Sequence, residues 1–394
     1  MMPSYYEFYC PVKIVSGYKA IDNLPHELQQ MNVKKPLIIT DKGIVLAGII
    51  DLIKEVFREY DMDIPPIYDE VPPDSSNKIV NQAASVFRKN NCDSIIAIGG
   101  GSAIDTAKGL NIVVSEDTDD LMKFVGADRI DHPLMPFVVI PTTAGTGSEV
   151  TLVAVIYNED KGIKMAFTSY FLLPNVAILD PRMTLSLPSN ITAATGMDAL
   201  THAIEAFYCL QKNPLSDGYA ISAIRLIRDN LLEAVKNGKN KQARLAMANA
   251  ALMAGIAFSN SMVGMVHSLG HATGSVAHVP HGVAMSIFLP FGMEYNLEKN
   301  QNELAELLMY LGGEEEYSKT PKNERAMRSI EIIKELKNNL YDLCKLPRTL
   351  KEAGVSEDKL PEIAKLAIDD PSIIFNPKEM SFDQAMKILK KAYN

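Results

Sequence analysis

Short apolar runs alternate with segments of helical periodicity through the first half of the chain. Runs of this length, bounded by turn residues, are typical of strands buried on both faces of a sheet. The predicted strands are residues 36–40, 94–98 and 136–140. The predicted helices are residues 49–60, 79–89 and 103–110. This alternation predicts a parallel α/β layer, and residues 151–157 and 176–179 are expected to be further strands at its edge.

The pattern changes after about Pro188, where strand-like runs stop and apolar positions recur at helical spacing. The predicted helices of this part are residues 191–210, 217–236, 241–265 and 330–343. The polar stretch at 312–316 is predicted to be a solvated loop. We therefore predict two domains, an α/β domain at 1–187 and an all-helical domain at 188–394.

Charge and composition exclude several classes of protein. The 394 residues carry a net charge of −9, from 39 Lys and Arg against 48 Asp and Glu. Nucleic-acid binding and polybasic membrane attachment both need a basic surplus that this chain lacks. The uncharged stretch 245–266 is long enough to span a bilayer, but the polar residues Asn249 and Asn260 interrupt it, so we predict a buried helix.

The N-terminal sequence contains neither the basic nor the apolar region of a secretory signal, which predicts a cytoplasmic protein. Reduced thiols are expected in that compartment. The four cysteines show no metal-like spacing and are interpreted as ordinary structural thiols: Cys10, Cys92, Cys209 and Cys344.

Two glycine-rich segments follow predicted strands and are candidates for binding phosphate. Residues 99–102 read Gly-Gly-Gly-Ser and lead directly into a predicted helix. Glycines there let the backbone approach a phosphate, and the N–H groups of the helix N-terminus attract its charge. The second segment, 141–149, offers hydroxyls and backbone amides that suit a pyrophosphate or a ribose. A glycine-requiring turn and a polar crossover loop are the structural alternatives.

Asp41 ends the predicted strand at 36–40. A carboxylate at this place can accept hydrogen bonds from an adenosine ribose and would repel a 2′-phosphate, which favours NAD over NADP. The alternative is an aspartate that caps a helix or stabilises a turn.

Histidines are concentrated in the second half, where they suggest a metal site. Asp198 and His202 are four residues apart in a predicted helix and so share one face. Four more histidines fall within residues 267–281, and two of them could complete a carboxylate–imidazole site. Such a ligand set suits Fe(II), Zn or Mn and has no thiolate that would select zinc. The spacing leaves open which two of these histidines bind.

Taken together, four motifs resemble the iron-containing (group III) alcohol dehydrogenases. They are GGGS-x-x-D-x-A-K at 99–108, PTTAGTGSE at 141–149, DALTHAIEA at 198–206, and His267 followed by Pro-His-Gly at 280–282. The resemblance covers nearly the whole chain and is weakest at residues 310–380. It implies a Rossmann-like parallel-sheet domain followed by a helical metal-binding domain, an architecture shared with dehydroquinate synthase.

The resemblance also implies roles for individual residues. The implied metal ligands are Asp198, His202, His267 and His281, and the implied cofactor contacts are Asp41, Gly100, Gly101, Ser102, Thr142, Thr146 and Lys164. His271 is implied to lie near the substrate and the nicotinamide, and Phe258 to line the substrate pocket. Asp74 stands where many members have Asn. His278 matches no ligand of the family and is assigned a structural or pocket-polarity role.

The resulting hypothesis is an NAD- and metal-dependent alcohol dehydrogenase that acts on a primary alcohol or small diol, or on the corresponding aldehyde. The metal would stabilise the alkoxide, hydride would pass to the nicotinamide, and His271 would relay the proton. Iron is favoured by the resemblance, with zinc as the alternative, and a homodimer or higher homo-oligomer is implied. The competing functions are a dehydroquinate synthase-like lyase, whose usual first ligand differs, and a nucleotide-binding regulatory protein without turnover.

Overall fold

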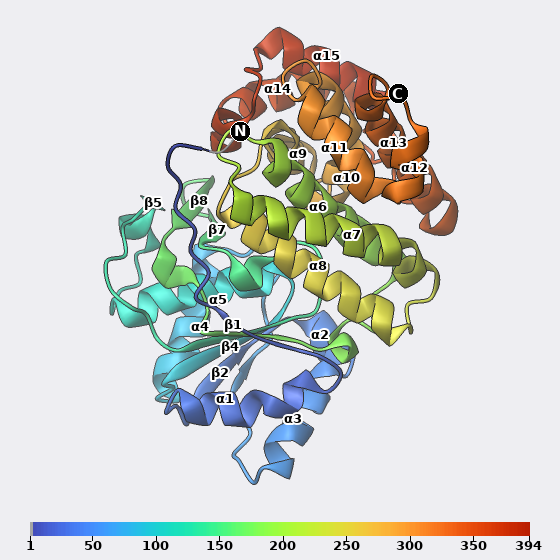
Figure 1. The fold of residues 1–394 in the computed structure, drawn as a ribbon. Coiled ribbons are helices and arrows are strands. Elements are labelled where there is room, and N and C mark those ends of the chain that lie inside the picture. Colours follow the sequence, from blue (N-terminus) through green and yellow to red (C-terminus); the bar gives the residue numbers. More distant parts are fainter. Residues whose placement is uncertain (1–2) are drawn as a thin grey trace. The chain divides into compact units, whose positions relative to one another are not determined.

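The computed structural model describes residues 3–394, which form two compact units (Figure 1). The α/β unit is Cys10–Ser186. The helical unit is Leu187–Asn394 together with the described residues up to Tyr9. The described residues before Cys10 thus belong with the helices, whereas the division made from the sequence assigned them to the first domain.

The α/β unit contains a six-stranded sheet in the order β1-β9-β6-β4-β2-β3, and every adjacent pair in it is parallel. The strands are β1 (Lys13–Ser16), β2 (Pro36–Ile39), β3 (Ile67–Tyr68), β4 (Ser94–Gly99), β6 (Phe137–Pro141) and β9 (Val176–Leu179). The four strands at the centre of the sheet, β9, β6, β4 and β2, are buried at every residue. Burial on both faces explains the uninterrupted apolar runs, and the predicted parallel layer is confirmed.

Helices cover both faces of this sheet. They are α1 (Leu24–Gln30), α2 (Lys42–Leu46), α3 (Ile49–Glu59), α4 (Asn77–Lys89) and α5 (Gly101–Ser115). Successive residues of β4 point to opposite faces. Ile95 packs in one hydrophobic core with Phe87 of α4, and Ile96 packs in the other with Phe57 of α3. The sheet is therefore a rigid platform whose strand ends carry the loops discussed below.

The two further strands predicted at 151–157 and 176–179 are present, but their predicted place at the edge of the parallel sheet was wrong. β9 lies between β1 and β6 inside the sheet, because β1 covers its outer side. β7 (Val153–Asn158) belongs to a separate three-stranded sheet, in which it pairs antiparallel with β8 (Ile163–Thr168), and β8 pairs with β5 (Gly126–Ala127). β7 alternates buried and exposed residues, as expected for a strand with only one face in a core.

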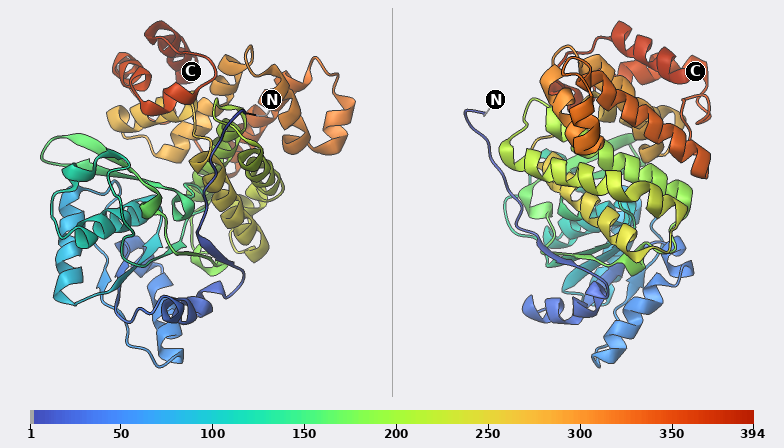
Figure 2. Two further views of the ribbon diagram at one scale, coloured as in Figure 1. Left: turned by 60° about the vertical axis from the view of Figure 1, so that its left-hand side comes forward. Right: turned by 45° about the vertical axis from the view of Figure 1, so that its right-hand side comes forward.

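The described part of the helical unit has no strands. Its α-helices are α6 (Ser189–Tyr208), α7 (Pro214–Lys236), α8 (Lys241–Ser259), α9 (Met265–Ala277), α10 (His281–Asn296), α11 (Gln301–Leu311), α12 (Gly313–Lys319), α13 (Arg325–Cys344), α14 (Leu360–Ile368) and α15 (Phe382–Tyr393). α7 and α8 run side by side (Figure 2), and α6 contacts α7, α8 and α10. α6 is thereby almost entirely buried beyond its first turn.

Short 3-10 turns connect several of these elements. They are Ala20–Asn23, Leu121–Phe124, Ser148–Val150, Tyr170–Leu172, Pro181–Met183, Glu357–Lys359 and Pro371–Phe375. The turn at Pro371–Phe375 follows Asp370, whose side chain caps it by accepting from the Ser372 amide at 2.8 Å.

Two predictions in the helical unit were wrong. The single helix predicted at 241–265 is broken after Ser259, and Met262 adopts a left-handed backbone conformation with φ of 69° before α9 begins. The loop predicted at 312–316 is the start of α12, where three glutamates occupy the first turn. Acidic side chains are favourable at that end of a helix dipole, so the local charge is compatible with a helix.

None of the helices in residues 3–394 is both long enough and apolar enough to cross a membrane. The uncharged stretch at 245–266 is divided between α8 and α9, and most of α8 is buried. All four cysteines are free thiols, and Cys209 among them is buried.

Candidate active site

Helix α6 presents a carboxylate and an imidazole side by side in the interior of the helical unit. Asp198 and His202 are both buried, and Nδ1 of His202 lies 3.8 Å from Oδ1 of Asp198. The spacing of four residues places them one turn apart on the same face. Because α6 is surrounded by other helices, these two polar side chains lie where an apolar residue would ordinarily pack.

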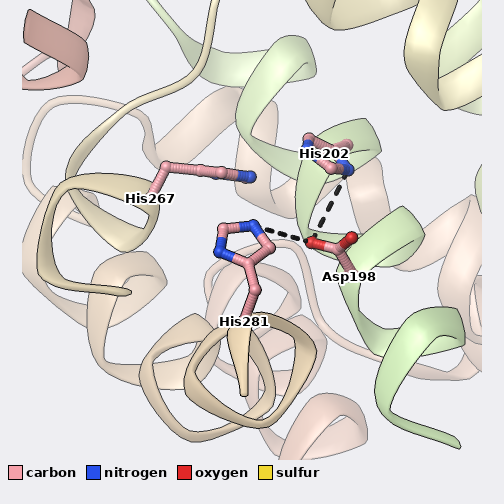
Figure 3. Close-up of side chains that lie close together, drawn as sticks. All are labelled: Asp198, His202, His267 and His281. Atoms are coloured by element: carbon pink, nitrogen blue, oxygen red, sulfur yellow. Dashed lines mark ion pairs between the residues drawn. The ribbon is translucent and has the colours of Figure 1, made fainter. Parts of the chain in front are cut away.

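Two further imidazoles reach the same point from neighbouring helices (Figure 3). His267 lies in the first turn of α9, and His281 is the first residue of α10. Nε2 of His281 lies 3.2 Å from Oδ1 of Asp198. One donor atom from each of the four residues lies within 4.8 Å of the other three. Asp198, His202, His267 and His281 thus converge on one point.

The buried donor atoms of this cluster fit a divalent cation. Nδ1 of His202 and Nε2 of His267 are buried and have no hydrogen-bond partner among the described residues. An unsatisfied buried polar atom costs about 1–3 kcal/mol, so two in one cluster need an explanation. A cation bound by the three imidazoles and the carboxylate would satisfy them. The N/O ligand set without a thiolate suits Fe(II), Zn or Mn.

The protonation states favour the same interpretation. Burial lowers the pKa of His202 to about 3, and burial also lowers the pKa of His267 well below its usual value. Burial alone would raise the pKa of Asp198, but the neighbouring imidazoles outweigh it and hold that pKa well below the usual range. Neutral imidazoles and an ionised carboxylate are the forms that bind metal ions.

A second carboxylate lies behind His267. Oε2 of Glu205 is 2.5 Å from Nδ1 of His267, and Oε1 of Glu205 accepts a hydrogen bond from the Val266 amide at 2.8 Å. Burial raises the pKa of Glu205 to about 7, and backbone N–H groups at the start of α9 oppose this shift. Sequence reasoning gave Glu205 no role, although it follows Asp198 by seven residues and His202 by three, which places it on the same face of α6.

His271 lies one turn along α9 from His267, and its ring stacks on that of His281 with the centroids 5.4 Å apart. Nδ1 of His271 is 3.0 Å from Oδ2 of Asp370, a residue that sequence reasoning missed because 99 positions separate the two. The His271 side chain is 44% exposed, so water can reach it. This contact forms a histidine–aspartate pair beside the four converging side chains.

The remaining predicted residues of the helical unit have distinct positions. The Phe258 ring stacks on His202 with the centroids 4.2 Å apart, and its partly exposed side chain supplies an apolar surface beside the cluster. His278 terminates α9 in a left-handed conformation with φ of 55°. It lies outside the group of four converging ligands.

In the α/β unit, the two glycine-rich segments pack directly against each other. Gly100 is the N-cap of α5 and Gly101 its first residue. A Cβ atom on Gly100 would lie 3.3 Å from the Thr143 side chain, and one on Gly101 would lie 3.2 Å from Thr146. The amide of Thr142 donates to the carbonyl oxygen of Gly99 at 3.0 Å. Glycine therefore allows this close approach at the N-terminus of α5, where the first backbone N–H groups of a helix have no partner within it.

Asp41 caps a helix and also lies close to the first glycine-rich segment. Its Oδ1 accepts a hydrogen bond from the Ile44 amide at 3.0 Å, so it is the N-cap of α2. Its other oxygen lies 3.8 Å from where a Cβ atom on Gly99 would be, and so lies beside the first glycine-rich segment. The capping bond holds the carboxylate at that place.

Two further predicted cofactor contacts are Ser102 on α5 and Lys164 on β8. Ser102 accepts a hydrogen bond at Oγ from the amide of Asp74, at 3.3 Å. Lys164 is exposed on β8, opposite Tyr157 of β7, and belongs to the small three-stranded sheet.

Lys108, Asp105 and Glu149 form a buried ionic cluster next to the two loops, and sequence reasoning did not single it out. The Lys108 ammonium donates to the carbonyl oxygens of Thr151 and Val153 at 2.7 and 2.8 Å. Burial lowers the pKa of Lys108 to about 8, while nearby Asp105 and Glu149 oppose that shift. These three ionisable residues belong to the two glycine-rich motifs, so the motifs contribute to the stability of the loops as well as to their shape.

Comparison with known proteins identifies two family matches that together span most of the chain. Residues 11–181 match the family described as "Iron-containing alcohol dehydrogenase", and residues 192–393 match "Fe-containing alcohol dehydrogenase family, C-terminal". The 1,3-propanediol dehydrogenase of Klebsiella pneumoniae is 36% identical over 379 residues, covering 96% of each chain. The NAD-dependent methanol dehydrogenase of Bacillus methanolicus is 35% identical over 385 residues, covering 98% of this chain and 99% of the relative.

The fold is similar to that of a solved 1,3-propanediol oxidoreductase. The two structures superimpose with a TM-score of 0.94 at 35% sequence identity, over 99% of this chain and all of the other. The alignment covers nearly the whole chain and so includes both units.

Proposed function

We propose that this chain, which belongs to the iron-containing alcohol dehydrogenase family, uses NAD to oxidise a primary alcohol or small diol and also catalyses the reverse reduction of the aldehyde. The relatives are dehydrogenases of 1,3-propanediol and methanol, and a small polar alcohol is the chemistry they share. The observation that carries the proposal is the buried convergence of Asp198, His202, His267 and His281.

The reaction balances as the transfer of one hydride and one proton. With NAD bound, the alcohol would lose a hydride from its carbinol carbon and a proton from its hydroxyl, and the products would be an aldehyde, NADH and a proton. When bound, the cation supplies Lewis acidity toward the alcohol oxygen, and NAD supplies the hydride acceptor. The helical unit provides the four ligands that hold the cation, and the α/β unit provides the loops for the dinucleotide.

His271 and Asp370 handle the proton in this proposal. Asp370 accepts a hydrogen bond from Nδ1 of His271, so the proton of the neutral ring is held at that atom. Nε2 then has the lone pair that can accept the hydroxyl proton of the alcohol. Because the His271 side chain is partly exposed, the ring can release this proton to water. Phe258 is assigned to the apolar wall along which the substrate chain lies.

NAD rather than NADP is the proposed cofactor. Gly100, Gly101, Ser102, Thr142 and Thr146 are assigned to the phosphates and riboses, because the loops that contain them approach each other closely and open onto the N-terminus of α5. Asp41 is assigned to the adenosine ribose, where its charge opposes a 2′-phosphate. Lys164 is retained as a contact from the small sheet. A relative that is NAD-dependent supports the same choice.

Fe(II) is the proposed metal, and zinc is the alternative. Both accept three imidazoles and a carboxylate, so the ligand set does not separate them, and iron is supported by the description of the family. The lyase alternative is less well supported, because both family matches and the relatives are alcohol dehydrogenases. The four intact ligands argue against a regulatory protein without turnover.

The test is a panel of primary alcohols, diols and aldehydes with NAD(H) and NADP(H), run on protein reconstituted with Fe(II) or with zinc. We expect net NADH formation from a small alcohol or diol, with more activity for one metal. His267→Ala should lose bound metal and activity together, and the same change at His278, which lies outside the cluster, should leave the metal content unchanged. Full activity of metal-free protein would refute the scheme.

The assembly and the location of the protein are also proposals. We expect a homodimer or higher homo-oligomer in the cytoplasm that binds neither nucleic acid nor membrane. Light scattering after size exclusion measures the assembly, and cell fractionation measures the location. A monomer at micromolar concentration would contradict the first expectation.

A further inference from the structure

The face of α6 that carries two metal ligands also carries Glu205. Asp198, His202 and Glu205 stand at positions i, i+4 and i+7 and so form one stripe along the helix. The Glu205 side chain is fully buried, and each of its two carboxylate oxygens is hydrogen-bonded to a residue of α9. Oε1 accepts from the Val266 amide, and Oε2 is bonded to Nδ1 of His267.

We infer that Glu205 is a positioning residue that determines which nitrogen of His267 is offered to the metal. With its carboxylate ionised, Glu205 can only accept hydrogen bonds, so Nδ1 of His267 must carry the ring proton in order to donate to it. A neutral imidazole has one N–H, and Nε2 is therefore left with a lone pair. Nε2 is the buried atom of His267 that has no hydrogen-bond partner among residues 3–394.

Glu205 also holds the helix that carries His267. It accepts at the N-terminus of α9, where the positive end of the helix dipole favours the ionised carboxylate. Asn376 caps the same end by accepting from the Met265 amide at 3.2 Å. Gly264 lies between them, and a Cβ atom there would be 2.8 Å from Oδ1 of Asn376 and 3.1 Å from Oε1 of Glu205. Both side chains therefore constrain the backbone at the start of α9, whereas of these two it is Glu205 that contacts the His267 ring.

Capping and control of the tautomer can be separated by one nearly isosteric change. Glu205→Gln keeps an oxygen that can accept from the Val266 amide, but it places an amide NH₂ group beside Nδ1 of His267. An NH₂ donor requires an acceptor at Nδ1, and the ring proton then moves to Nε2, where it blocks the metal. A residue that acts only as a cap would tolerate this change.

This inference rests on the metal site of the proposed function, and its experiment is a competition titration of the metal-free protein with Fe(II) or Zn(II) against a chromophoric chelator. We expect Glu205→Gln to bind the metal about 10- to 100-fold more weakly than the wild type, with a wild-type circular dichroism spectrum. Asn376→Ala should lower the unfolding temperature and leave the metal affinity of the folded protein unchanged. Asp370→Asn makes the same carboxylate-to-amide change beside His271 and should also leave the metal affinity unchanged.

Wild-type metal affinity in folded Glu205→Gln would overturn the inference and leave the proposed function intact, whereas wild-type protein that binds no metal would overturn the proposed function itself. If the variant does not fold, ring ¹⁵N spectra of metal-free wild-type protein decide the question. The His267 signals, identified by their loss in His267→Gln, should show a protonated Nδ1 and an unprotonated Nε2. The opposite tautomer would overturn the inference.

Discussion

Gly282→Ala is expected to damage the candidate metal site although Gly282 is not one of its four ligand residues. Gly282 follows His281, one of the four candidate ligands, at the start of α10. A Cβ atom on it would lie 2.3 Å from the backbone oxygen of Ala194 and 2.6 Å from its carbonyl carbon. Ala194 belongs to α6 and precedes the candidate ligand Asp198 by one turn. The close approach of α10 to α6 therefore occurs where each helix carries a ligand.

The size of the effect follows from this distance. Close contacts between carbon and carbonyl oxygen begin at about 3.3 Å, so the two helices would have to separate by roughly 1 Å. The obstacle is helix backbone and cannot rotate aside, so a cost of about 1–3 kcal/mol in the free energy of unfolding is expected. A shift of this size would also move His281 away from the cluster, and a cation held there would need metal–nitrogen distances of about 2.1 Å. Metal affinity should therefore fall at least tenfold.

Gly270→Ala is the matched control, since it adds the same methyl group to α9 against a flexible side chain. Its Cβ atom would lie 1.9 Å from the terminal methyl group of Met285, which can rotate away. Alanine is also favoured over glycine within a helix by about 1 kcal/mol, which offsets part of the repacking cost. Its stability should stay within about 1 kcal/mol of the wild type, with metal affinity retained.

The assay combines the urea midpoint, followed by circular dichroism, with the chelator competition titration. The expected result is a loss of stability and of metal affinity in Gly282→Ala but not in Gly270→Ala. Wild-type metal affinity in Gly282→Ala, or equal damage in both variants, would refute the argument that rigid backbone rather than a flexible side chain sets the cost.

Three further outcomes are expected. Asp41→Asn keeps the capping bond to Ile44 and removes the charge that opposes a 2′-phosphate, so the ratio of kcat/KM for NADP to that for NAD should rise about tenfold; an unchanged ratio would contradict the ribose assignment. Lys108→Met leaves buried Glu149 without a compensating cation and should lower the free energy of unfolding of the α/β unit by about 3–5 kcal/mol, measured by urea denaturation. An unchanged midpoint would contradict this. Asp370→Asn should reduce kcat at least tenfold with KM for NAD unchanged, as steady-state kinetics would show, because His271 loses its orienting acceptor; an unaltered kcat would remove the pair from the mechanism.

The sequence by itself predicted the class of the fold and the chemistry of the cluster. Strands such as β4 and helices such as α4 have patterns set by near neighbours, since the periodicity of 2 or 3.6 residues is local. The pairing of Asp198 with His202 is likewise contained within one helical turn. The family resemblance, based on long motifs in a fixed order, added His267 and His281 to the predicted ligands.

Only the tertiary structure decided what depends on distant contacts. The spacing of residues 267–281 left the choice of histidines open, and the packing of α9 and α10 against α6 brings His267 and His281 to Asp198. His271 is instead hydrogen-bonded to Asp370, which lies 99 residues away in the sequence. Asp370 belongs to the region whose resemblance to the family is weakest. The position of β9 inside the sheet likewise depends on its pairing with β1, a strand that lies at the opposite end of the α/β unit in sequence. A local pattern records which side of an element is buried, but not which element buries it, and metal ligation needs the second kind of information.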